Sequence, residues 1–298
     1  MRLAATEYVR PTSVDGAVTV LSSTPGARVL AGGQTLINAL KHRAAAVELL
    51  VDISRLEELR SIEVGVDGSA RIGAAATYCE LAGSAELRAA QPVIGRVAGG
   101  TVDRQIRARG TIGGNACCAD PASNFPPLLV ALDAALEIRG PDGTRTVPAS
   151  EFFVGVFRTA VGPGELLSTI TLPPPAGAAV GYESLLLAAD SWALARAVAL
   201  VRANGTMSDV RVVLGCVAGT PVRALATEAA LIGGPASADA VEAAARLAGE
   251  GIDPPSDAHA SSSYRREMAA VMVKRALLSA ISQLTDGREA GGKEDGDQ

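Results

Sequence analysis

A glycine pair, Gly32-Gly33, separates a short apolar run from a helical pattern in the first part of the sequence. The apolar run, Ala27–Ala31, predicts a strand, and Gln34–Leu40 predicts a helix. A helix is also predicted earlier, over Ala17–Leu21, and Glu48–Ile53 is an apolar run of strand length. This order predicts an αβαβ unit with its glycine turn at the carboxyl end of a parallel strand.

The turn itself, Ala31-Gly-Gly-Gln-Thr-Leu36, fits a phosphate-binding loop. Glycine allows the backbone to approach a ligand closely, and the first N–H groups of a helix have no partner within the helix. Ligands of open α/β sheets also bind at this end of the strands. An ordinary strand-to-helix turn, with Thr35 only as a cap, explains the same residues, and for this motif alone it is the simpler interpretation.

The composition excludes several other classes of function. Of 298 residues, 48% are hydrophobic and 20% are charged, so the chain can bury one large core or two ordinary ones. A net charge of -5 provides no basic surface for nucleic acid, and 3% aromatic residues are too few for base stacking. Neither a GxGxxG nor a GxxxxGKS/T motif is present, and His42 and His259 are too few for a histidine-rich metal centre.

Cysteine usage predicts a cytoplasmic protein. The four cysteines have no CxxC spacing and no histidine nearby, which argues against a disulfide scaffold, a zinc site and an iron–sulfur site; they are Cys79, Cys117, Cys118 and Cys216. The adjacent pair is most simply interpreted as small buried residues, with a redox role as the alternative. We find no secretory signal pattern and no apolar run of about 18 residues, so we expect neither secretion nor membrane insertion.

A second glycine pair, Gly113-Gly114, lies in the segment Arg109–Asn115. We predict a polar loop over residues 103–118, between an apolar helix over Ala90–Ala98 and another over Pro126–Leu132. Two glycine turns among small hydrogen-bonding residues favour a ligand with a diphosphate bridge, held from opposite sides by the two turns.

Further candidates surround the second glycine pair. Side chains suited to sugar or polyol hydroxyls are Asp120, Ser123 and Asn124. A local cationic cluster consists of Arg104, Arg107 and Arg109. These arginines suit phosphate, although arginines in polar loops are more often solvated or paired with carboxylates. The single tryptophan, Trp192, is either a core residue or a stacking platform.

The remaining patterns predict hairpins, helices and one linker. The hairpin strands are Ser61–Val64 with Ala70–Gly73, and Leu136–Arg139 with Arg145–Val147. Thr77 caps a predicted helix over Tyr78–Leu87. A strand over Gly164–Leu172 stops at Pro173-Pro174-Pro175, where we place a domain boundary. Beyond it, strands are predicted over Ala193–Arg202, Val210–Val217 and Pro221–Arg223, and helices over Thr227–Ile232, Ala238–Gly249 and Tyr264–Leu284.

Residues 7–285 resemble the FAD-binding medium subunit of the molybdenum hydroxylases, as in aerobic carbon monoxide dehydrogenase and xanthine dehydrogenase. Ala31–Leu36 resembles the first phosphate loop of this family, and Arg107–Asn115 resembles its second glycine loop. Ala119–Pro126 is similar to its Ala-Asp-Pro pattern. Further similar stretches are Glu151–Gly155, Pro163–Leu167 and Pro254–Arg266.

The resemblance implies an α+β fold with a bipartite FAD-binding domain of the PCMH type. An αβαβ subdomain would cover residues 1–55 and a larger α/β subdomain residues 56–175, with FAD in the cleft between them. A small C-terminal α+β domain would cover residues 176–285. We expect the charged, glycine-rich residues 286–298 to be disordered.

The resemblance also implies the cofactor-binding residues. The backbone that would hold the FAD diphosphate belongs to Ala31, Gly32, Gly33, Gln34, Thr35 and Leu36. Facing it would be Thr111, Gly113, Gly114 and Asn115. Asp120 and Asn124 would bind the ribityl chain and neighbouring groups. Thr77 occupies a family turn, and Val161 and Leu166 would border the isoalloxazine ring. Trp192 is a further candidate for cofactor binding.

Two departures from the family pattern concern this site. Asn124 stands where relatives usually carry an acidic residue, so it can accept a hydrogen bond but brings no charge. Relatives also usually carry one or two basic residues just before an Asp-Phe or Asp-Trp element, and in the corresponding segment of this chain, Glu183–Trp192, those positions are apolar. Loss of a cation near a flavin would alter its potential or its choice of acceptor.

The implied function is electron transfer by a flavoprotein subunit. It would take electrons from the clusters of an iron–sulfur small subunit and pass them to an external acceptor, while a molybdopterin large subunit oxidises the substrate. No catalytic acid, base, nucleophile or metal ligand is nominated. The alternative is a stand-alone FAD-dependent oxidoreductase acting directly on a small organic substrate. A third hypothesis, a flavin-free assembly protein, conflicts with the intact glycine loops.

Overall fold

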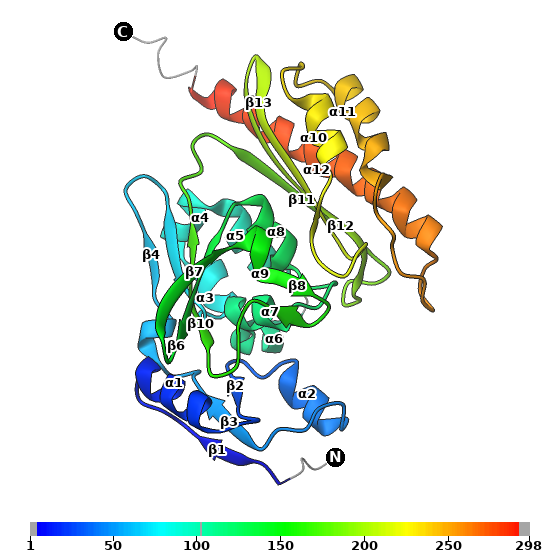
Figure 1. The fold of residues 1–298 in the computed structure, drawn as a ribbon. Helices are drawn as coiled ribbons and strands as arrows, with labels where there is room; N and C mark the ends of the chain where they lie inside the picture. The colour runs from blue at the N-terminus through cyan, green and yellow to red at the C-terminus, as the bar shows by residue number, and fades with distance from the viewer. Residues whose placement is uncertain (1–4, 102, 292–298) are drawn as a thin grey trace. The chain divides into compact units, whose positions relative to one another are not determined.

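The computed structural model describes residues 5–101 and 103–291, with side chains as far as residue 285. Two compact units make up the chain (Figure 1): Met1–Phe125 with Asp133–Pro174, and Pro126–Leu132 with Pro175–Gln298. The last passage between them falls within the predicted proline linker. Among the described helices, none has the length and apolar character needed to cross a lipid bilayer.

The first unit begins with a three-stranded parallel sheet of order β1 (Glu7–Val9), β3 (Leu49–Asp52) and β2 (Arg28–Leu30). Helix α1 (Val14–Ser23) starts at Ser13, whose hydroxyl accepts a hydrogen bond from the Gly16 N–H. Helix α2 (Leu36–Lys41) lies between β2 and β3 in the chain. The predicted αβαβ order is therefore confirmed, and β1 is an additional strand that the analysis of the sequence missed.

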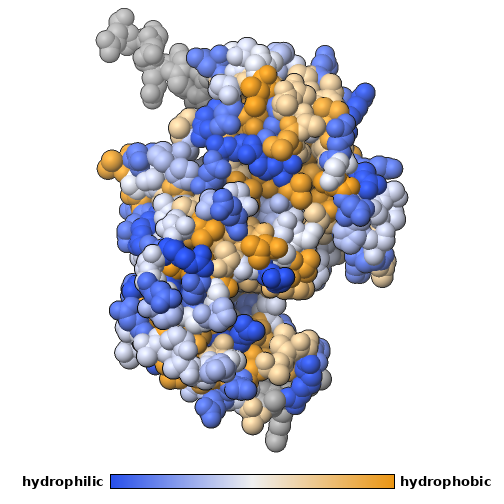
Figure 2. All heavy atoms as spheres, viewed as in Figure 1, coloured by the Kyte–Doolittle hydropathy of each residue, from blue (hydrophilic) through white to orange (hydrophobic). Residues whose placement is uncertain are grey.

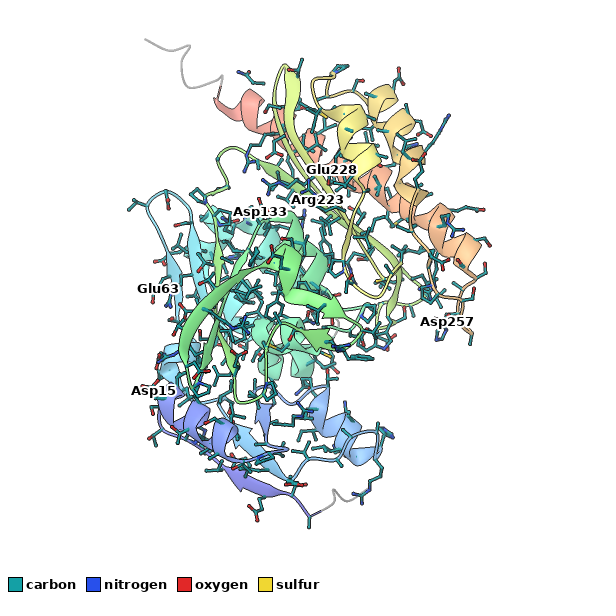
Figure 3. All side chains as sticks on the ribbon, in the orientation of Figure 1. Asp15, Glu63, Asp133, Arg223, Glu228 and Asp257 are labelled. Carbon is teal, nitrogen blue, oxygen red and sulfur yellow. The ribbon has the colours of Figure 1, made fainter. Side chains whose placement is uncertain are left out.

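The two helices pack against different residues of the same central strand. Leu49 and Val51 of β3 share an apolar cluster with α1, whereas Leu50 shares a cluster with Leu40 of α2. Alternate residues of a strand point to opposite faces, so the helices cover opposite faces of the sheet (Figure 1). Asp15 of α1 (Figure 3) forms an ion pair of 2.6 Å with Arg139 of the neighbouring sheet.

A cluster of hydrogen-bonded polar side chains lies at the carboxyl end of β3, around Asp52. The buried Asp52 carboxylate accepts hydrogen bonds from the Tyr8 hydroxyl, the Ser54 N–H at 2.9 Å and Arg10 Nη2 at 2.9 Å. Burial by itself would raise the pKa of Asp52, but these hydrogen bonds outweigh it and lower the pKa from 3.8 to about 2.

Asp52→Asn is expected to reduce the free energy of unfolding at pH 7 by about 2 kcal/mol. Because the folded state depresses this pKa, the stabilisation is complete above the ordinary pKa of 3.8 and is lost as the pH falls toward about 2. Urea unfolding at several pH values should show this acid sensitivity in the wild type and a flatter profile in the variant. Asp142→Asn, in an exposed turn, should leave the profile unchanged.

The second sheet of the first unit has five antiparallel strands: β4 (Ile62–Val64), β5 (Ala70–Gly73), β10 (Leu166–Leu172), β6 (Ala135–Gly140) and β7 (Gly143–Pro148). Both predicted hairpins are confirmed, as β4–β5 and β6–β7. The strand predicted over Gly164–Leu172 is confirmed as β10. A short helix η1 (Glu57–Leu59) precedes this sheet in the chain.

Helices of this unit differ from the predicted ones at several points. The helix predicted over Tyr78–Leu87 is two helices, α3 (Tyr78–Gly83) and α4 (Ala85–Ala90), because Ser84 is extended and caps the second. The next helix, α5 (Pro92–Gly100), begins at a proline, which suits the first helical position.

The polar loop predicted over residues 103–118 is wrong. The segment forms α6 (Arg104–Arg109) and α7 (Ile112–Cys118), each started by a side chain that accepts a backbone N–H. Asp103 accepts from Gln105 at 2.6 Å, and Thr111 accepts from Gly114 at 3.0 Å. Low helix propensity of the glycines suggested a loop, but caps and packing outweigh propensity here.

An exposed apolar hairpin lies later in the first unit. Short helix α9 (Ala149–Phe152) leads into β8 (Phe153–Gly155) and β9 (Arg158–Thr159), neither of which was predicted as a strand. Val154, Val156 and Phe157 are all exposed here. Hydrophobic groups also interrupt the hydrophilic surface on the face shown in Figure 2.

The second unit is a four-stranded antiparallel sheet with helices. Its strands are β11 (Ala179–Leu186), β12 (Ala193–Asn204), β13 (Thr206–Gly215) and β14 (Val222–Arg223), in that order. Its helices are α10 (Leu225–Leu231), α11 (Ala238–Ala245), η2 (Arg246–Gly249) and the long α12 (Ser262–Gly291), which lies along the sheet (Figure 1). Part of α8 (Phe125–Ala131) also belongs to this unit.

Most of the strands and helices predicted for this unit are confirmed. Strand β11 was not predicted. The disordered tail predicted over residues 286–298 is wrong for its first part, because α12 continues to Gly291, while residues 292–298 lie outside the described residues. A helix already packed against a sheet can extend through residues of low propensity, since its nucleus is in place.

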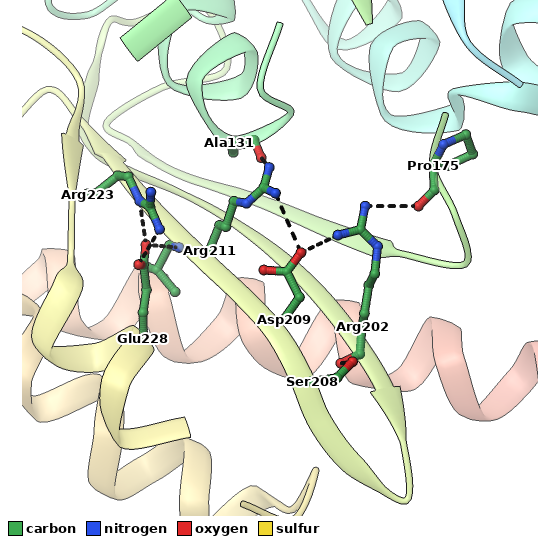
Figure 4. A network of polar contacts seen from close by, with 9 residues as sticks. Ala131, Pro175, Arg202, Ser208, Asp209, Arg211, Arg223 and Glu228 are labelled. Carbon is green, nitrogen blue, oxygen red and sulfur yellow. Dashed lines mark hydrogen bonds and ion pairs between the residues drawn. The ribbon is translucent and has the colours of Figure 1, made fainter. Parts of the chain in front are cut away.

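An arginine network lies along β12 and β13 (Figure 4). Asp209 pairs with Arg202 and with Arg211, the latter at 3.5 Å. These arginines also donate to backbone carbonyls, Arg202 to Pro175 and Arg211 to Ala131, each at 3.3 Å. Pro175 and Ala131 each lie within two residues of a boundary between the two units. Asp209 therefore binds, through Arg202 and Arg211, to both of these boundary segments.

Candidate functional site

The first glycine loop joins the end of β2 to the start of α2. Gly33 has φ +73°, a conformation that favours glycine, and the Gln34 side chain donates to the Gly32 carbonyl at 3.0 Å. Thr35 makes no side-chain cap, which contradicts the simpler interpretation of this turn. Within the described part of the chain, the N–H groups of Gln34, Thr35 and Leu36 donate no hydrogen bond. They remain available to an anion.

The second glycine loop is hydrogen-bonded to the segment 74–78, which leads into α3 and includes its first residue. The Ile112 N–H donates to Ala76 at 3.1 Å, and the Gly113 N–H donates to Ala74 at 2.9 Å. The Tyr78 N–H donates to Gly110 at 2.9 Å. A Cβ on Gly113 would lie 2.5 Å from the Ala74 carbonyl oxygen, so this approach requires glycine.

The two glycine pairs therefore differ in what they offer a ligand. The N–H of Gly113 already donates to Ala74, and that of Gly114 donates to the Thr111 hydroxyl at 3.0 Å. The expectation that both pairs present free amide hydrogens is met only by the first loop. In the second loop, the backbone at the start of α7 instead packs closely against the segment 74–78.

The structure brings the two loops together. A Cβ on Gly32 would lie 1.9 Å from the Arg109 carbonyl oxygen and 3.0 Å from Gly110 Cα. Burial, and then the nearby Asp120 carboxylate, raise the pKa of the Cys118 thiol, whereas the Thr35 side chain acts in the opposite direction and lowers it. Segments almost eighty residues apart in the sequence thus meet at one place in the first unit.

Polar residues after α7 are held by local hydrogen bonds. Asp120 accepts from the Ala122 N–H at 2.8 Å, and Asn124 donates to the Thr101 hydroxyl at 3.2 Å. Asn115, within α7, accepts from the Phe125 N–H at 3.2 Å. The turn that carries Asp120 and Asn124 starts at Ala119, which has φ +47°. These hydrogen bonds fix the orientation of the three side chains.

Other predicted site residues have different surroundings. The hydroxyl of Thr77 donates to Glu80 Oε2 and accepts from the Glu80 N–H, so its only hydrogen is already used within the protein. Val161 is half-buried after β9. Leu166 is 1% exposed and belongs to the apolar cluster that includes residues of α1. Trp192 belongs to the second unit, where it is 67% exposed.

The predicted cationic cluster is confirmed only in part. Arg104, Arg107 and Arg109 all lie on α6, and Arg107 donates to the Thr101 carbonyl at 2.7 Å. Two features near these loops were not predicted: the effect of Thr35 on the Cys118 thiol and the carboxylate of Glu80. The Thr-x-x-Glu spacing of Thr77 and Glu80 is the signature of a capping box, so the contact between these two residues could have been predicted from the sequence.

The donor set of these loops fits a diphosphate-containing ligand. Free N–H groups at the start of α2 can donate to anions, and Gly32, which has no side chain, lies directly against the backbone of Arg109 and Gly110. No group of three or more potential metal ligands occurs among the described residues. The arrangement suits binding of a cofactor rather than acid–base or nucleophilic chemistry by the chain itself.

Comparisons with known families and proteins identify the family of this chain. Residues 4–175 match the family described as "FAD binding domain in molybdopterin dehydrogenase", and residues 182–280 match the "CO dehydrogenase flavoprotein C-terminal domain". The carbon monoxide dehydrogenase medium chain of Afipia carboxidovorans is 39% identical over 275 residues, which cover 91% of this chain and 95% of that protein.

Two further similarities extend this agreement. The glyceraldehyde dehydrogenase medium chain of Sulfolobus acidocaldarius is 34% identical over 271 residues, covering 91% of this chain and 96% of that protein. A solved structure of carbon monoxide dehydrogenase from Hydrogenophaga pseudoflava matches with a TM-score of 0.91 and 38% identity, covering 95% of this chain and 99% of that chain. This chain therefore belongs to the FAD-binding medium subunits of the molybdenum hydroxylases, the flavoprotein subunits of multi-subunit oxidoreductases.

Proposed function

We propose that this chain binds FAD at the two glycine loops and carries electrons from the iron–sulfur clusters of one partner subunit to an external acceptor. A separate molybdopterin subunit would oxidise the substrate. The bound flavin would supply the redox chemistry, since flavins exchange electrons with one- and two-electron partners. The chain's own residues would bind and orient the flavin.

The convergence of the two loops is the observation that carries this proposal. The free N–H groups of Gln34, Thr35 and Leu36 would donate to the diphosphate, while Gly32 lets the second loop lie against the first. This part of the site would be completed by Ala31, Gly33 and the second-loop residues from Thr111 to Asn115. Asp120 and Asn124 would then bind hydroxyl groups of the cofactor.

The substrate of the complex would be selected by another subunit. Relatives named for carbon monoxide and for glyceraldehyde dehydrogenation are 39% and 34% identical to this chain, although these two substrates have little chemistry in common. We also propose a reducing, cytoplasmic location, because all four cysteines are free thiols.

A titration of the flavin-free protein tests the cofactor site. Flavin fluorescence should report tight binding of FAD and much weaker binding of FMN and riboflavin, which lack the diphosphate bridge. Equal affinity for FAD and riboflavin would show that the loops do not bind the diphosphate. A purified chain that oxidised an organic substrate with turnover, without partner subunits, would instead support the stand-alone oxidoreductase.

A further inference from the structure

The carboxylate of Glu80, in α3, contacts both Thr77 and Arg60. One oxygen, Oε2, accepts from the Thr77 N–H at 2.7 Å and from the Thr77 hydroxyl at 2.8 Å. The other oxygen, Oε1, pairs with Arg60, which follows η1. Burial would raise the pKa of Glu80, but the Thr77 and Arg60 hydrogen bonds together lower it. Both oxygens of an ionised carboxylate are therefore satisfied.

Thr77 lies in the segment 74–78, whose backbone is hydrogen-bonded to the second glycine loop. Thr77 and Thr111 form an antiparallel bridge, and the bonds from Ile112 to Ala76 and from Tyr78 to Gly110 lie on either side of it. The conformation of Thr77 thus determines where the start of α7 lies. That part of the chain in turn meets Gly32 through Arg109 and Gly110.

The simpler role for Glu80 is a helix cap alone. Glu80 and Thr77 form a complete capping box for α3, a common device that stabilises a helix start. Two features go beyond a cap. First, Arg60, which lies outside the helix, forms an ion pair with the Glu80 carboxylate. Second, Thr77 is itself bridged to Thr111 of the second glycine loop. A cap alone predicts a loss of stability when Glu80 is removed, without any change at the cofactor.

We propose that Glu80, held by Arg60, is a positioning residue for FAD. It fixes Thr77 and, through the paired backbone, sets the second glycine loop at the distance from the first that the diphosphate requires. Thr77 then acts on the cofactor through Glu80 and the backbone, not through a contact of its hydroxyl. This inference rests on the proposed function and goes beyond it by assigning a role to Glu80 and Arg60.

Glu80→Ala in the full chain is expected to weaken FAD binding about tenfold, measured by flavin fluorescence titration. Glu80→Gln keeps an acceptor for Thr77 but loses the charge that pairs with Arg60, so a smaller loss is expected, and this variant serves if the alanine variant does not fold. Ser84→Ala is the matched control. It removes the cap of α4, where the Ser84 hydroxyl accepts from the Leu87 N–H at 3.1 Å, and should lower the thermal midpoint without changing FAD affinity.

Phosphorus NMR of bound FAD provides a readout that a purely structural role would not change. The diphosphate resonances should shift in Glu80→Gln and stay in place in Ser84→Ala. Unchanged resonances and unchanged affinity in both Glu80 variants would overturn the inference.

A double-mutant cycle separates the two roles of Thr77. If Thr77 acts through Glu80, Thr77→Ala weakens FAD binding in the wild type but has no further effect in Glu80→Ala. Additive losses would mean that the Thr77 hydroxyl contacts the cofactor directly, and would contradict the inference. Thr77→Ser should restore wild-type affinity. Failure of the wild type to bind FAD would instead refute the proposed function itself.

Discussion

Gly32→Ala is expected to weaken FAD binding by about 100-fold and to lower the thermal midpoint of the protein. The new methyl group would lie 1.9 Å from the Arg109 carbonyl oxygen and 2.7 Å from its carbon. A backbone carbonyl cannot move aside as a flexible side chain does, so the two loops must separate. Separation removes the second loop from the diphosphate site while the free N–H groups of the first loop remain. Flavin fluorescence titration and thermal unfolding measure the two effects.

Gly99→Ala is the matched control for this substitution. Gly99 lies in α5, and the nearest atom to an added Cβ is the Ala82 Cβ at 3.6 Å, an ordinary contact. Since alanine is a better helix former than glycine, the control should be equally stable or more stable, by up to about 1 kcal/mol, and should bind FAD normally. Wild-type affinity in Gly32→Ala would show that close approach of the loops is unnecessary, and the assignment of the site would fail.

Gly181→Ala is expected to destabilise the second unit by about 3 kcal/mol or more, which corresponds to a fall of about 10 °C in the thermal midpoint. Gly181 is in β11, and a Cβ there would lie 1.9 Å from the Ala276 carbonyl oxygen of α12. Both groups belong to backbone held in regular structure, so the helix must move off the sheet. This movement would open the apolar core that α12 covers.

Hydrogen exchange locates this effect. Peptides from β11 and α12 should exchange faster in Gly181→Ala, while those from the three-stranded sheet of the first unit should be unchanged. Gly83→Ala, where an added Cβ meets no atom within 4 Å, should behave as the wild type. Wild-type stability of Gly181→Ala would mean that α12 packs on β11 less closely than the structure shows.

Elements with a strong local signal were predicted well from the sequence. The β4–β5 and β6–β7 hairpins carry turn residues between alternating strands, and the αβαβ order carries apolar runs separated by the first glycine pair. These patterns depend on neighbours in the sequence, so one segment is enough to recognise them. The same applies to the Ala31–Leu36 loop, whose geometry follows from glycine and the start of a helix.

Elements stabilised by distant contacts were predicted poorly. The segment 103–118 has low helix propensity but forms α6 and α7, because α7 is paired with residues 74–78. The capping pair of Thr77 and Glu80 was visible in the sequence, but its connection to Arg60 was not, since that contact spans twenty residues.

The order of residues alone was sufficient to identify the family, the two glycine loops and the kind of ligand that free amides at a helix start prefer. Folding decided which amides remain free: those of Gln34, Thr35 and Leu36 do, and those of Gly113 and Gly114 do not. It also decided that Gly32 is required by the carbonyl of Arg109. Each backbone group can form only a few hydrogen bonds, and which partners reach it depends on segments far away in the chain.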